Sequence, residues 1–412
     1  MGHGMTRILY LGDIIPTRSE TFVYREIFAL RKRGVLIDTA SLHAPEYGLG
    51  DTELDDLAAS SLPIYPRGFL RIVLDAVSEV IQRPLQSFKT LAQVFSDSLF
   101  GGDLNLERRL KLLWQGVASL SLASRVRVLE VKHIHAHFAH VPTTLAMYTA
   151  MQLNVGFSFT GHAVDIFPNR TLLTEKVQRA KFVACISEWH RDFYRSLFQR
   201  EDEDLVIVRC GVDSSLYEIT PAPFGEVFEL LAVGRLVEKK GFDTLLRALI
   251  WIGKENLSPI HLTLVGDGPL RNELENMASQ LPAHISVTLT GDTPNQVIME
   301  KMATADLFVL PCSVTSSGDR DGIPVVLMEA MVHGRCVIAG DLEAIRELVR
   351  DDVSGVIVPL GDPVILGQEI ESLRSDRLRM ERLGRGARAR VEEEFDIHLN
   401  AQRLAQRFTR EG

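Results

Sequence analysis

The chain has 412 residues, of which 46% are hydrophobic and 24% charged, and its formal net charge is −9. This length favours two domains of roughly 200 residues, and the negative charge argues against general nucleic-acid binding. The four cysteines show no close pairing, no signal-peptide pattern is seen, and no apolar run reaches the roughly 18 residues that a membrane span needs. We therefore expect a cytoplasmic protein with reduced thiols.

The first predicted elements are a strand, a helix and a second strand. Residues 7–11 (RILYL) form an apolar run, residues 19–33 have helical spacing closed by Gly34, and residues 35–42 (VLIDTASL) are a second predicted strand. This order is typical of a doubly wound parallel sheet, in which ligands bind beyond the carboxyl ends of the strands.

The loop at residues 12–21 therefore faces a predicted ligand crevice. Ser19, Glu20 and Thr21 stand at its end, where the first helix begins. These side chains either contribute to the crevice or serve only to cap the helix.

Residues 65–132 are helical in pattern and differ in charge from the rest of the chain. They contain ten Lys and Arg against six Asp and Glu, a net +4, which leaves −13 for the remainder. One interpretation is a basic face that rests on an anionic membrane. The alternative is a set of helices that covers the sheet and exposes a solvated basic surface.

Four histidines follow in residues 133–140 (HIHAHFAH). Alternation along a strand would place the first three on one face, where they could chelate a metal, but no carboxylate or cysteine lies among them in this segment. We expect no metal here, and we expect His137, at the end of the strand, to reach the crevice. Another strand at residues 155–160 leads to His162 and Asp165, which occupy the equivalent place after the next strand.

A break in the periodic pattern at residues 215–225 predicts a linker between domains. The strand at residues 228–233 then starts a second doubly wound domain. It is followed by GRLVEKKG, in which Gly234 lets a backbone approach while Arg235 and Lys240 supply cations; we expect a diphosphate site in this turn. Lys239 is a less certain contributor.

Two further turns of the second domain follow predicted strands. Residues 261–265 lead to Gly266, Asp267, Gly268 and a proline, and residues 287–290 lead to a loop that ends at Val297. Both turns lie at carboxyl ends of strands and hence at the predicted crevice, but alone they are weak evidence for a particular ligand.

The organising segment of the second domain is residues 316–340 (SSGDRDGIPVVLMEAMVHGRCVIAG). A small acidic loop ends at Asp321, a helix opens at Ile323 and Pro324, and Glu329 lies in its second turn. The helix start suits a phosphate and the acids suit sugar hydroxyls. Asp319 and Asp321 also form a DxD pattern, but its position in the C-terminal half disfavours a metal site.

Several of these segments resemble a known family. DGIPVVLMEAMV resembles the EGxPxxxxEAMA signature of retaining glycosyltransferases of family 4, GRLVEKKG resembles GRLxxxKG, and VGDGP, HAHFA and FTGHAVDI have counterparts in the same family. PTRSETF resembles the opening of its exopolysaccharide and colanic-acid members. The chain departs from the family in lacking a Gly-Gly phosphate loop near residue 12, and in carrying Asp321 where Glu is usual.

The resemblance implies a GT-B fold, in which two doubly wound domains face each other and a C-terminal helix crosses back. The N-terminal domain would span residues 1–214 with the helix at 395–412, and the C-terminal nucleotide-sugar domain residues 226–394. It implies front-face retaining transfer from a nucleotide-diphosphate sugar, with UDP-sugars favoured and GDP-mannose next. The acceptor would be a saccharide, which we expect to be lipid-linked, and neither a cofactor nor a metal is required.

The resemblance also implies a role for each matched residue. His162, Asp321 and Glu329 would be catalytic: His162 orients the sugar, Asp321 holds sugar hydroxyls and Glu329 holds the ribose. The acceptor side would include Ser19, Glu20, Thr21, His137 and Asp165. The donor would be bound by Gly234, Arg235, Lys240, Gly266, Asp267, Gly268, Val297, Gly322, Ile323, Pro324, Val325 and Glu329.

Three other functions stay open. The chain could be an inactive sugar-nucleotide-binding partner in a polysaccharide assembly, to which Asp321 gives weight. It could be a GT-B sugar-nucleotide epimerase, although the acids and histidines of that class are not evident. A phosphorylase that depends on pyridoxal phosphate would need a Schiff-base lysine motif, which we do not find. The expected location is cytoplasmic, with a peripheral position at the inner face of the cell membrane as an alternative.

Overall fold

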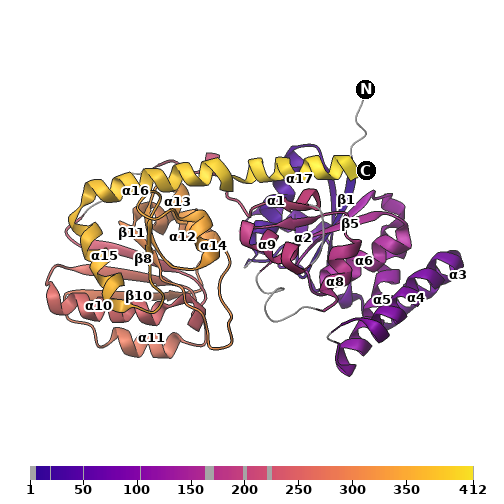
Figure 1. Cartoon of the computed structure of the whole chain (residues 1–412), viewed down its shortest axis with the longest axis horizontal. Helices are drawn as coiled ribbons and strands as arrows, with labels where there is room; N and C mark the ends of the chain where they lie inside the picture. Colours follow the sequence, from indigo (N-terminus) through magenta and orange to yellow (C-terminus); the bar gives the residue numbers. More distant parts are fainter. Residues whose placement is uncertain are drawn as a thin grey trace. The chain divides into compact units, whose positions relative to one another are not determined.

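A computed structural model of the chain describes residues 6–18, 20–49, 51–102, 104–162, 171–197, 202–219 and 225–411 (Figure 1). Of the predicted positions, Ser19, Asp165 and the linker residues 220–224 lie outside these ranges. None of the described helices combines the length and apolar character needed to cross a membrane.

Contacts divide the chain into two compact units. The first consists of residues 1–210 and 398–412, and the second of residues 211–397. The chain therefore passes between the units twice. The two connecting segments pair side by side through the backbone, since the Val212 amide donates to the Phe395 carbonyl at 3.1 Å and the Ile397 amide to the Val212 carbonyl at 3.0 Å. A Cβ on Gly211 would lie only 2.8 Å from Ile397 backbone atoms, so glycine allows this close approach.

The first unit is built on a parallel sheet of seven strands in the order β3-β2-β1-β4-β5-β6-β7. The strands are β1 (Arg7–Gly12), β2 (Leu36–Ser41), β3 (Leu62–Pro63), β4 (His133–His137), β5 (Gly156–Gly161), β6 (Val183–Cys185) and β7 (Leu205–Ile207). Its helices are α1 (Thr21–Lys32), α2 (Thr52–Ser60), α3 (Phe69–Gln82), α4 (Pro84–Phe100), α5 (Leu106–Val126), α6 (Val141–Leu153), α8 (Leu173–Arg179), α9 (Glu188–Leu197) and most of α17 (Ile397–Glu411).

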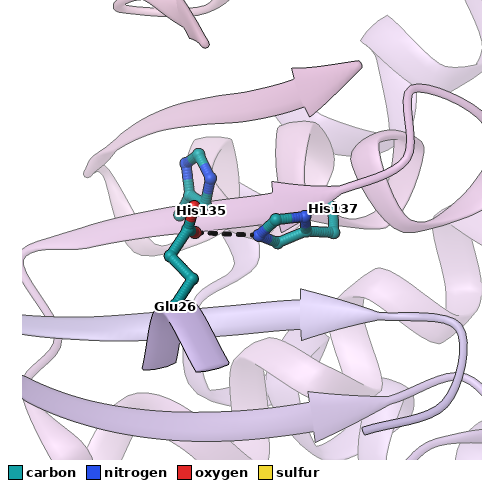
Figure 2. A group of neighbouring side chains, drawn as sticks. All are labelled: Glu26, His135 and His137. Atoms are coloured by element: carbon teal, nitrogen blue, oxygen red, sulfur yellow. Dashed lines mark hydrogen bonds and ion pairs between the residues drawn. The ribbon is translucent and has the colours of Figure 1, made fainter. Parts of the chain in front are cut away.

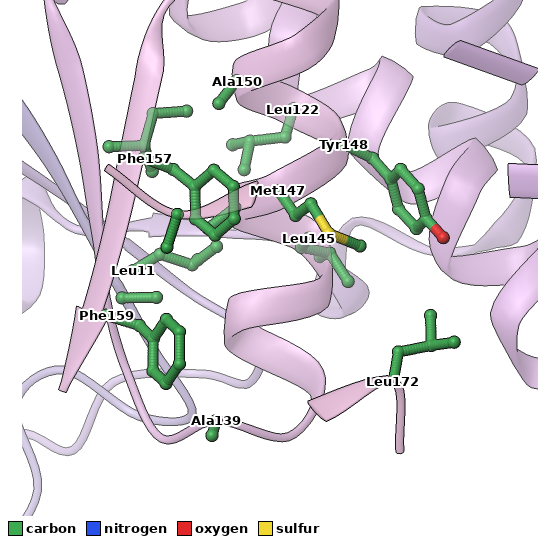
Figure 3. Close-up of a cluster of buried hydrophobic side chains, with 14 of the residues drawn as sticks. Leu11, Leu122, Ala139, Leu145, Met147, Tyr148, Ala150, Phe157, Phe159 and Leu172 are labelled. Carbon is green, nitrogen blue, oxygen red and sulfur yellow. The ribbon is translucent and has the colours of Figure 1, made fainter. Parts of the chain in front are cut away.

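One buried apolar cluster joins this sheet to its helices (Figure 3). Leu11 on β1 and Phe159 on β5 meet side chains of α5 and α6, among them Leu122 and Leu145. The β-branched and aromatic composition of the strands suits such a doubly covered sheet. The helical pattern predicted for residues 65–132 is confirmed by α3, α4 and α5.

The second unit repeats the same topology with six strands. Its parallel order is β10-β9-β8-β11-β12-β13. The strands are β8 (Phe228–Val233), β9 (Ile260–Val265), β10 (Ile285–Gly291), β11 (Leu307–Leu310), β12 (Cys336–Gly340) and β13 (Val356–Val358). The helices are α10 (Phe242–Glu255), α11 (Arg271–Ala278), α12 (Asn295–Thr304), α13 (Val325–Val332), α14 (Glu343–Leu348), α15 (Pro363–Ser375) and α16 (Arg377–Arg390).

Each sheet thus has the doubly wound order, and the predicted fold class of two such sheets is confirmed. The strand order reverses between β1 and β4 in the first unit and between β8 and β11 in the second. We call the loops beyond these strand pairs the first and the second switch point. In doubly wound sheets a switch point opens a crevice at the carboxyl ends of the strands, where ligands bind.

The C-terminal helix α17 belongs to the first unit from residue 398 onward. Phe408 is fully buried, and its ring lies 6.3 Å from Tyr10, 5.6 Å from His133 and 5.9 Å from Phe182, measured between ring centroids. These contacts attach the last helix to strands β1, β4 and the segment that enters β6.

Candidate active site

The second switch point is held together by the backbone of two loops, residues 234–241 after β8 and residues 311–324 after β11. The Cys312 amide donates to the Lys240 carbonyl at 3.1 Å, and the Ser313 amide donates to the Lys239 carbonyl at 2.8 Å. A third loop, after β9, joins them because the Leu236 amide donates to the Asp267 carbonyl at 2.9 Å. Three segments that the sequence predicted separately therefore form one structure.

Glycines make this interlock possible. A Cβ on Gly266, whose φ is 130°, would lie 2.1 Å from the Gly234 carbonyl oxygen, and a Cβ on Gly268 would lie 2.5 Å from the Leu236 carbonyl oxygen. At Gly241, with φ of 70°, a Cβ would lie 2.9 Å from the Cys312 carbonyl oxygen. Sequence alone assigned Gly266 and Gly268 to a ligand, and these contacts give a second reason for glycine at both positions, which is the close packing of the loops.

Two lysines face two aspartates inside this arrangement. The Lys240 ammonium lies 2.7 Å from an Asp321 carboxylate oxygen, and the Lys239 ammonium lies 3.2 Å from Asp319. Burial lowers the pKa of Lys240, but the charge of Asp321 and its hydrogen bond to the ammonium outweigh burial, so the pKa is raised. Lys240 therefore stays cationic, and the predicted partners Lys240 and Asp321 lie together.

The acids of the DxD pattern are thus already neutralised by side chains. Asp319 and Asp321 each contact a lysine, and the Lys239 ammonium also lies 3.8 Å from Asp321. Burial and the neighbouring Asp321 raise the pKa of the Cys312 thiol, which keeps this nearby group neutral. An incoming anion, such as a phosphate, could take the place of an aspartate carboxylate at either lysine ammonium.

Arg235 follows β8 directly, and its side chain is exposed. Within the described residues no hydrogen bond or ion pair engages its guanidinium. Asp267 is exposed as well, and its carboxylate accepts from the Gly268 amide at 2.7 Å. Arg235 is therefore the cation of this switch point whose fork of donors is available to a ligand.

The segment that contains Glu329 corrects two details of the prediction. Helix α13 begins at Val325, so Pro324 is the residue before the helix rather than its first residue, and Gly322 and Ile323 belong to the loop. Glu329 lies in the second turn as predicted, and only 4% of it is exposed. A carboxylate this buried requires hydrogen-bonding or ionic partners.

Val297 is likewise placed differently from the prediction. It was expected to end the loop after the third strand, but α12 begins at Asn295, so Val297 lies in the first turn of a helix. The loop after β10 ends before Val297, because the Val297 amide already donates to the Pro294 carbonyl at 3.0 Å. Its side chain is 37% exposed, which leaves it available for contact with a ligand.

The first switch point holds a chain of buried polar groups. Glu26 on α1 accepts a hydrogen bond from the Tyr10 hydroxyl at 2.8 Å, and its carboxylate lies 2.9 Å from His137 Nε2 (Figure 2). His137 Nδ1 in turn lies 3.3 Å from His162 Nε2. His137 ends β4 and His162 follows β5, so these two predicted residues are brought together.

The donors and acceptors in this chain constrain the protons. The Glu26 oxygen that faces His137 also accepts a hydrogen bond from the Tyr10 hydroxyl. Because this oxygen acts as an acceptor, the proton between it and His137 belongs to His137 Nε2. At 3.3 Å, one of the two facing nitrogens, His137 Nδ1 or His162 Nε2, donates a hydrogen bond to the other. Burial, followed by repulsion from His137 and other histidines, lowers the pKa of His162 well below 6.5, so this imidazole is neutral.

The other two strand histidines contact hydroxyls, although the buried Nδ1 of His133 has no hydrogen-bond partner within the described residues. Ser158 Oγ lies 2.7 Å from His133 Nε2 and 2.8 Å from His135 Nδ1, and Thr160 Oγ1 lies 3.0 Å from His135 Nε2. Ligand atoms of Glu26, His135 and His137 lie within 4.8 Å of one another, a spacing that a metal ion could bridge (Figure 2). Both nitrogens of His135 already meet a hydroxyl, however, so this set fits a hydrogen-bond network better than a metal centre.

Sequence analysis missed Glu26 and Tyr10. Glu26 lies on the buried face of α1, three residues after Val23 and one before Ile27. A carboxylate at a core position of a helix was the available signal, because such a group requires partners. Of the predicted acceptor-side residues, Thr21 is the first residue of α1 and Glu20 precedes it without a side-chain cap.

Residues 228–376 match the family described as Glycosyl transferases group 1. This segment is a group 1 glycosyl transferase domain. It contains β8 to β13 and hence the whole second switch point.

Two relatives are named for polysaccharide biosynthesis. The amylovoran biosynthesis glycosyltransferase AmsK of Erwinia amylovora is 31% identical over 205 residues, which is 50% of this chain and 50% of AmsK. WcaL of Escherichia coli (strain K12), named as a colanic acid biosynthesis glycosyltransferase, is 31% identical over 206 residues, 49% of this chain and 50% of WcaL. The chain thus spans about half the length of the curated relatives it matches, and the predicted resemblance to the exopolysaccharide and colanic-acid type is confirmed.

Among solved structures, Anabaena Alr3699/HepE in complex with UDP aligns over 97% of this chain and 99% of its own, with a TM-score of 0.71 and 16% identity. At this identity the likeness concerns the fold. The group 1 glycosyl transferase domain is therefore part of a GT-B fold that extends over the whole chain.

Proposed function

We propose that the protein is a retaining glycosyltransferase that moves a sugar from a nucleotide-diphosphate sugar to a saccharide acceptor in polysaccharide biosynthesis. The observation that carries this proposal is the second switch point, where Lys240 faces Asp321 at 2.7 Å and Arg235 offers an exposed guanidinium. Both cations lie in the group 1 domain, at the edge of the sheet where doubly wound folds bind phosphates.

In the proposed reaction, the bond between the sugar's anomeric carbon and the diphosphate oxygen breaks, and a bond to an acceptor hydroxyl oxygen forms on the same face. The hydroxyl proton passes to the departing diphosphate. Arg235, Lys240 and the start of α13 would stabilise the charge that develops on this leaving group, each contact contributing about 1.5–3 kcal/mol. No metal or other cofactor is required, because the cations of the chain take that role.

The acids and the buried imidazole would hold the rest of the donor. Glu329, in the second turn of α13, would bind ribose hydroxyls, and Asp321 would bind sugar hydroxyls once a phosphate oxygen has taken its place at Lys240. His162 would contact the sugar as a neutral group, positioned by His137 and Glu26. We propose UDP-sugars as the first donors to test, supported by the UDP in the related HepE crystals, and GDP-mannose as the next.

A lipid-linked saccharide is the acceptor that we propose from the net +4 of residues 65–132. An assay with a soluble acceptor and with the same acceptor on liposomes separates the two cases. Turnover that is equal in both contradicts the lipid-linked acceptor and leaves the transferase proposal intact.

Calorimetric titration with UDP, GDP and ADP tests the donor site. We expect one nucleotide to bind to the wild type and the Arg235→Ala variant to lose at least about tenfold in affinity, the value of a charge-assisted contact. Arg247→Ala is the matched control, because Arg247 is an exposed arginine of α10 that pairs within its own helix with Asp243. Absence of binding by all three nucleotides would contradict the proposed donor site.

Turnover separates the transferase from an inactive binding partner. The nucleotide that binds is offered as its sugar conjugate, and release of nucleoside diphosphate is followed with and without acceptor. We expect release, and we expect the anomeric configuration of the product to match that of the donor. Binding without any release, even by slow hydrolysis, would favour the binding partner, and an inverted product would contradict retention.

A further inference from the structure

Helix α4 has its polar and apolar sides reversed relative to an ordinary surface helix. Its buried residues are Ser87, Thr90, Val94, Asp97 and Ser98. Its exposed large side chains are Leu85, Phe88, Leu91, Phe95, Leu99 and Phe100, of which Leu85 and Phe100 are each 82% exposed. A helix that met only water on its outer side would show the opposite pattern.

Specific hydrogen bonds fix α4 in this orientation. Thr90 donates to the Gln152 side chain at 2.9 Å, and Asp97 accepts from Tyr148 at 2.8 Å and from both Arg179 amino groups at 2.6 and 2.7 Å. Buried polar groups persist in proteins when they are paired in this manner. The inner face of α4 is therefore a built polar interface, and its apolar residues point outward as a consequence.

The two neighbouring helices continue the apolar surface. Helices α3, α4 and α5 lie side by side (Figure 1). Exposed apolar residues of α3 are Phe69, Leu70, Leu74, Val77 and Ile81, and those of α5 are Leu106, Leu110 and Leu113. The Phe69 ring stacks on Trp114 of α5, with 5.1 Å between centroids. We call these exposed residues of α3, α4 and α5 the apolar helical face; apolar patches of such extent mark interaction surfaces.

The charges on the apolar helical face are almost all positive. Arg71 on α3, Lys89 on α4 and Lys111 on α5 are exposed, and so is Arg83 between α3 and α4. Glu107 is the exposed acid in the described residues of these three helices, and it pairs with Lys111. Apolar stripes bordered by Lys and Arg are the pattern of helices that lie in the interfacial layer of a membrane with anionic lipids.

We propose that α3, α4 and α5 dock on an anionic lipid bilayer, with their exposed Leu, Ile and Phe side chains below the headgroups and their cations at the lipid phosphates. A second copy of the chain fits less well. A symmetric dimer would place this face against itself and bring the cations Arg71, Lys89 and Lys111 of one copy toward the equally basic face of the other, where like charges repel. The proposal concerns a surface apart from the donor site and does not depend on the proposed transferase reaction.

Vesicle sedimentation without any sugar nucleotide tests the docking. The probes are vesicles of phosphatidylcholine alone and vesicles that also contain phosphatidylglycerol. The variant is L85E/L106E on the apolar helical face, and the control is L257E/L378E in the second unit. All four leucines are highly exposed, at 82% and 74% in the variant and 80% and 79% in the control, so each pair introduces the same charge without disturbing a core.

We expect the wild type and L257E/L378E to bind the anionic vesicles equally, and L85E/L106E to bind at least about tenfold more weakly. Binding should also weaken with added salt. A wild type that stays in the supernatant, or an L85E/L106E variant that binds as well as the control, would overturn the proposal. So would a wild-type dimer in analytical ultracentrifugation that L85E/L106E dissociates, because the face would then be covered by a second copy.

Discussion

At the second switch point, lysines meet aspartates whose side chains still reach solvent, since Lys240 is 15% and Asp321 12% exposed. At the first switch point, which has the same place in an equivalent sheet, Glu26 meets His137 with exposures of 8% and 1%. The same strand order therefore supports two kinds of polar site. One presents fixed charges that an anion can reach, and the other encloses a hydrogen-bonded network in which burial keeps the His162 imidazole neutral.

From this difference we expect the two units to have separate tasks. Nucleotide affinity should depend on the second switch point, because binding of a diphosphate needs cations near solvent. The first switch point should leave nucleotide affinity unchanged and affect later steps, because its groups orient an imidazole. Variants in each unit test whether nucleotide affinity and turnover depend on different switch points.

The largest effect is expected for Lys240→Met. The substitution removes the cation and leaves Asp321 without its partner beside the predicted diphosphate site, so nucleotide affinity should fall by about a hundredfold. Titration calorimetry measures it. Lys254→Met, an exposed lysine at the end of α10, removes the same charge elsewhere and should bind as the wild type does. Retained affinity in Lys240→Met would show that the interlocked loops serve only to hold the fold.

Glu26→Gln tests the first switch point. The amide keeps the shape of Glu26 but accepts a weaker hydrogen bond from His137 Nε2. The orientation of His137, and through it that of His162, is then less defined. We expect kcat to fall by about tenfold, the value of one charge-assisted hydrogen bond, while nucleotide affinity stays unchanged. Glu53→Gln on α2, an exposed glutamate of the same unit, is the control.

A spectroscopic measurement distinguishes positioning from simple loss of stability. The ring nitrogens of His137 and His162 are observed by NMR in wild type and Glu26→Gln, and a changed proton position on His162 is expected only if the network sets it. If Glu26→Gln lost nucleotide affinity instead of turnover, the division of tasks between the two units would be wrong.

The sequence predicted the second switch point better than the first, for a physical reason. In the second unit the informative residues are contiguous: Gly234, Arg235 and Lys240 lie in one turn, and Asp321 and Glu329 flank one helix start. Their spacing in the sequence is therefore enough to predict the kind of site that they form. The pairing of Lys240 with Asp321, across 81 residues, required the fold, although a cation and an acid after neighbouring strands made it a natural expectation.

At the first switch point the partners come from β1, α1, β4 and β5. Glu26 lies 111 residues from His137 and is hidden in an otherwise apolar helix face, so no local motif marks it. The exposed apolar residues of α4 were also missed, because helical spacing shows that a helix has two faces but not which of them is buried. The polar face of α4 is buried because it forms hydrogen bonds with Gln152, Tyr148 and Arg179, which are distant in sequence.

Acid should destabilise the first unit more than the second. Burial lowers the pKa of His133 to about 3 and that of His190 to about 4, and both lie in the first unit. Between pH 6.5 and about 4 the unfolded chain binds protons that the folded chain does not, so each such histidine removes about 1.4 kcal/mol of unfolding free energy per pH unit. The stability is present above pH 6.5 and is lost as the pH falls.

Hydrogen exchange at pH 7 and pH 5 measures this loss separately in each unit. The second unit has His333, whose pKa burial lowers to about 4, whereas the first has His133, His135, His162 and His190. His190→Gln should reduce the pH dependence of the first unit, whatever its effect on stability at pH 7. Equal pH dependence in both units would contradict the view that the first unit encloses neutral imidazoles.

The smallest effect is expected for Asp321→Glu, which adds one methylene and introduces the acid that the resembled signature carries. Its carboxylate can still reach Lys240, so affinity for the free nucleotide should change by less than about threefold, well under the value of one lost contact. The contribution of the sugar, taken as the ratio of affinities for nucleotide sugar and nucleotide, should change more, because the longer side chain reaches further toward sugar hydroxyls. If Asp321 acts only as the counter-ion of Lys240, that ratio will stay constant across donor sugars, and the role of Asp321 then belongs to the charge balance of the second switch point rather than to recognition of the sugar.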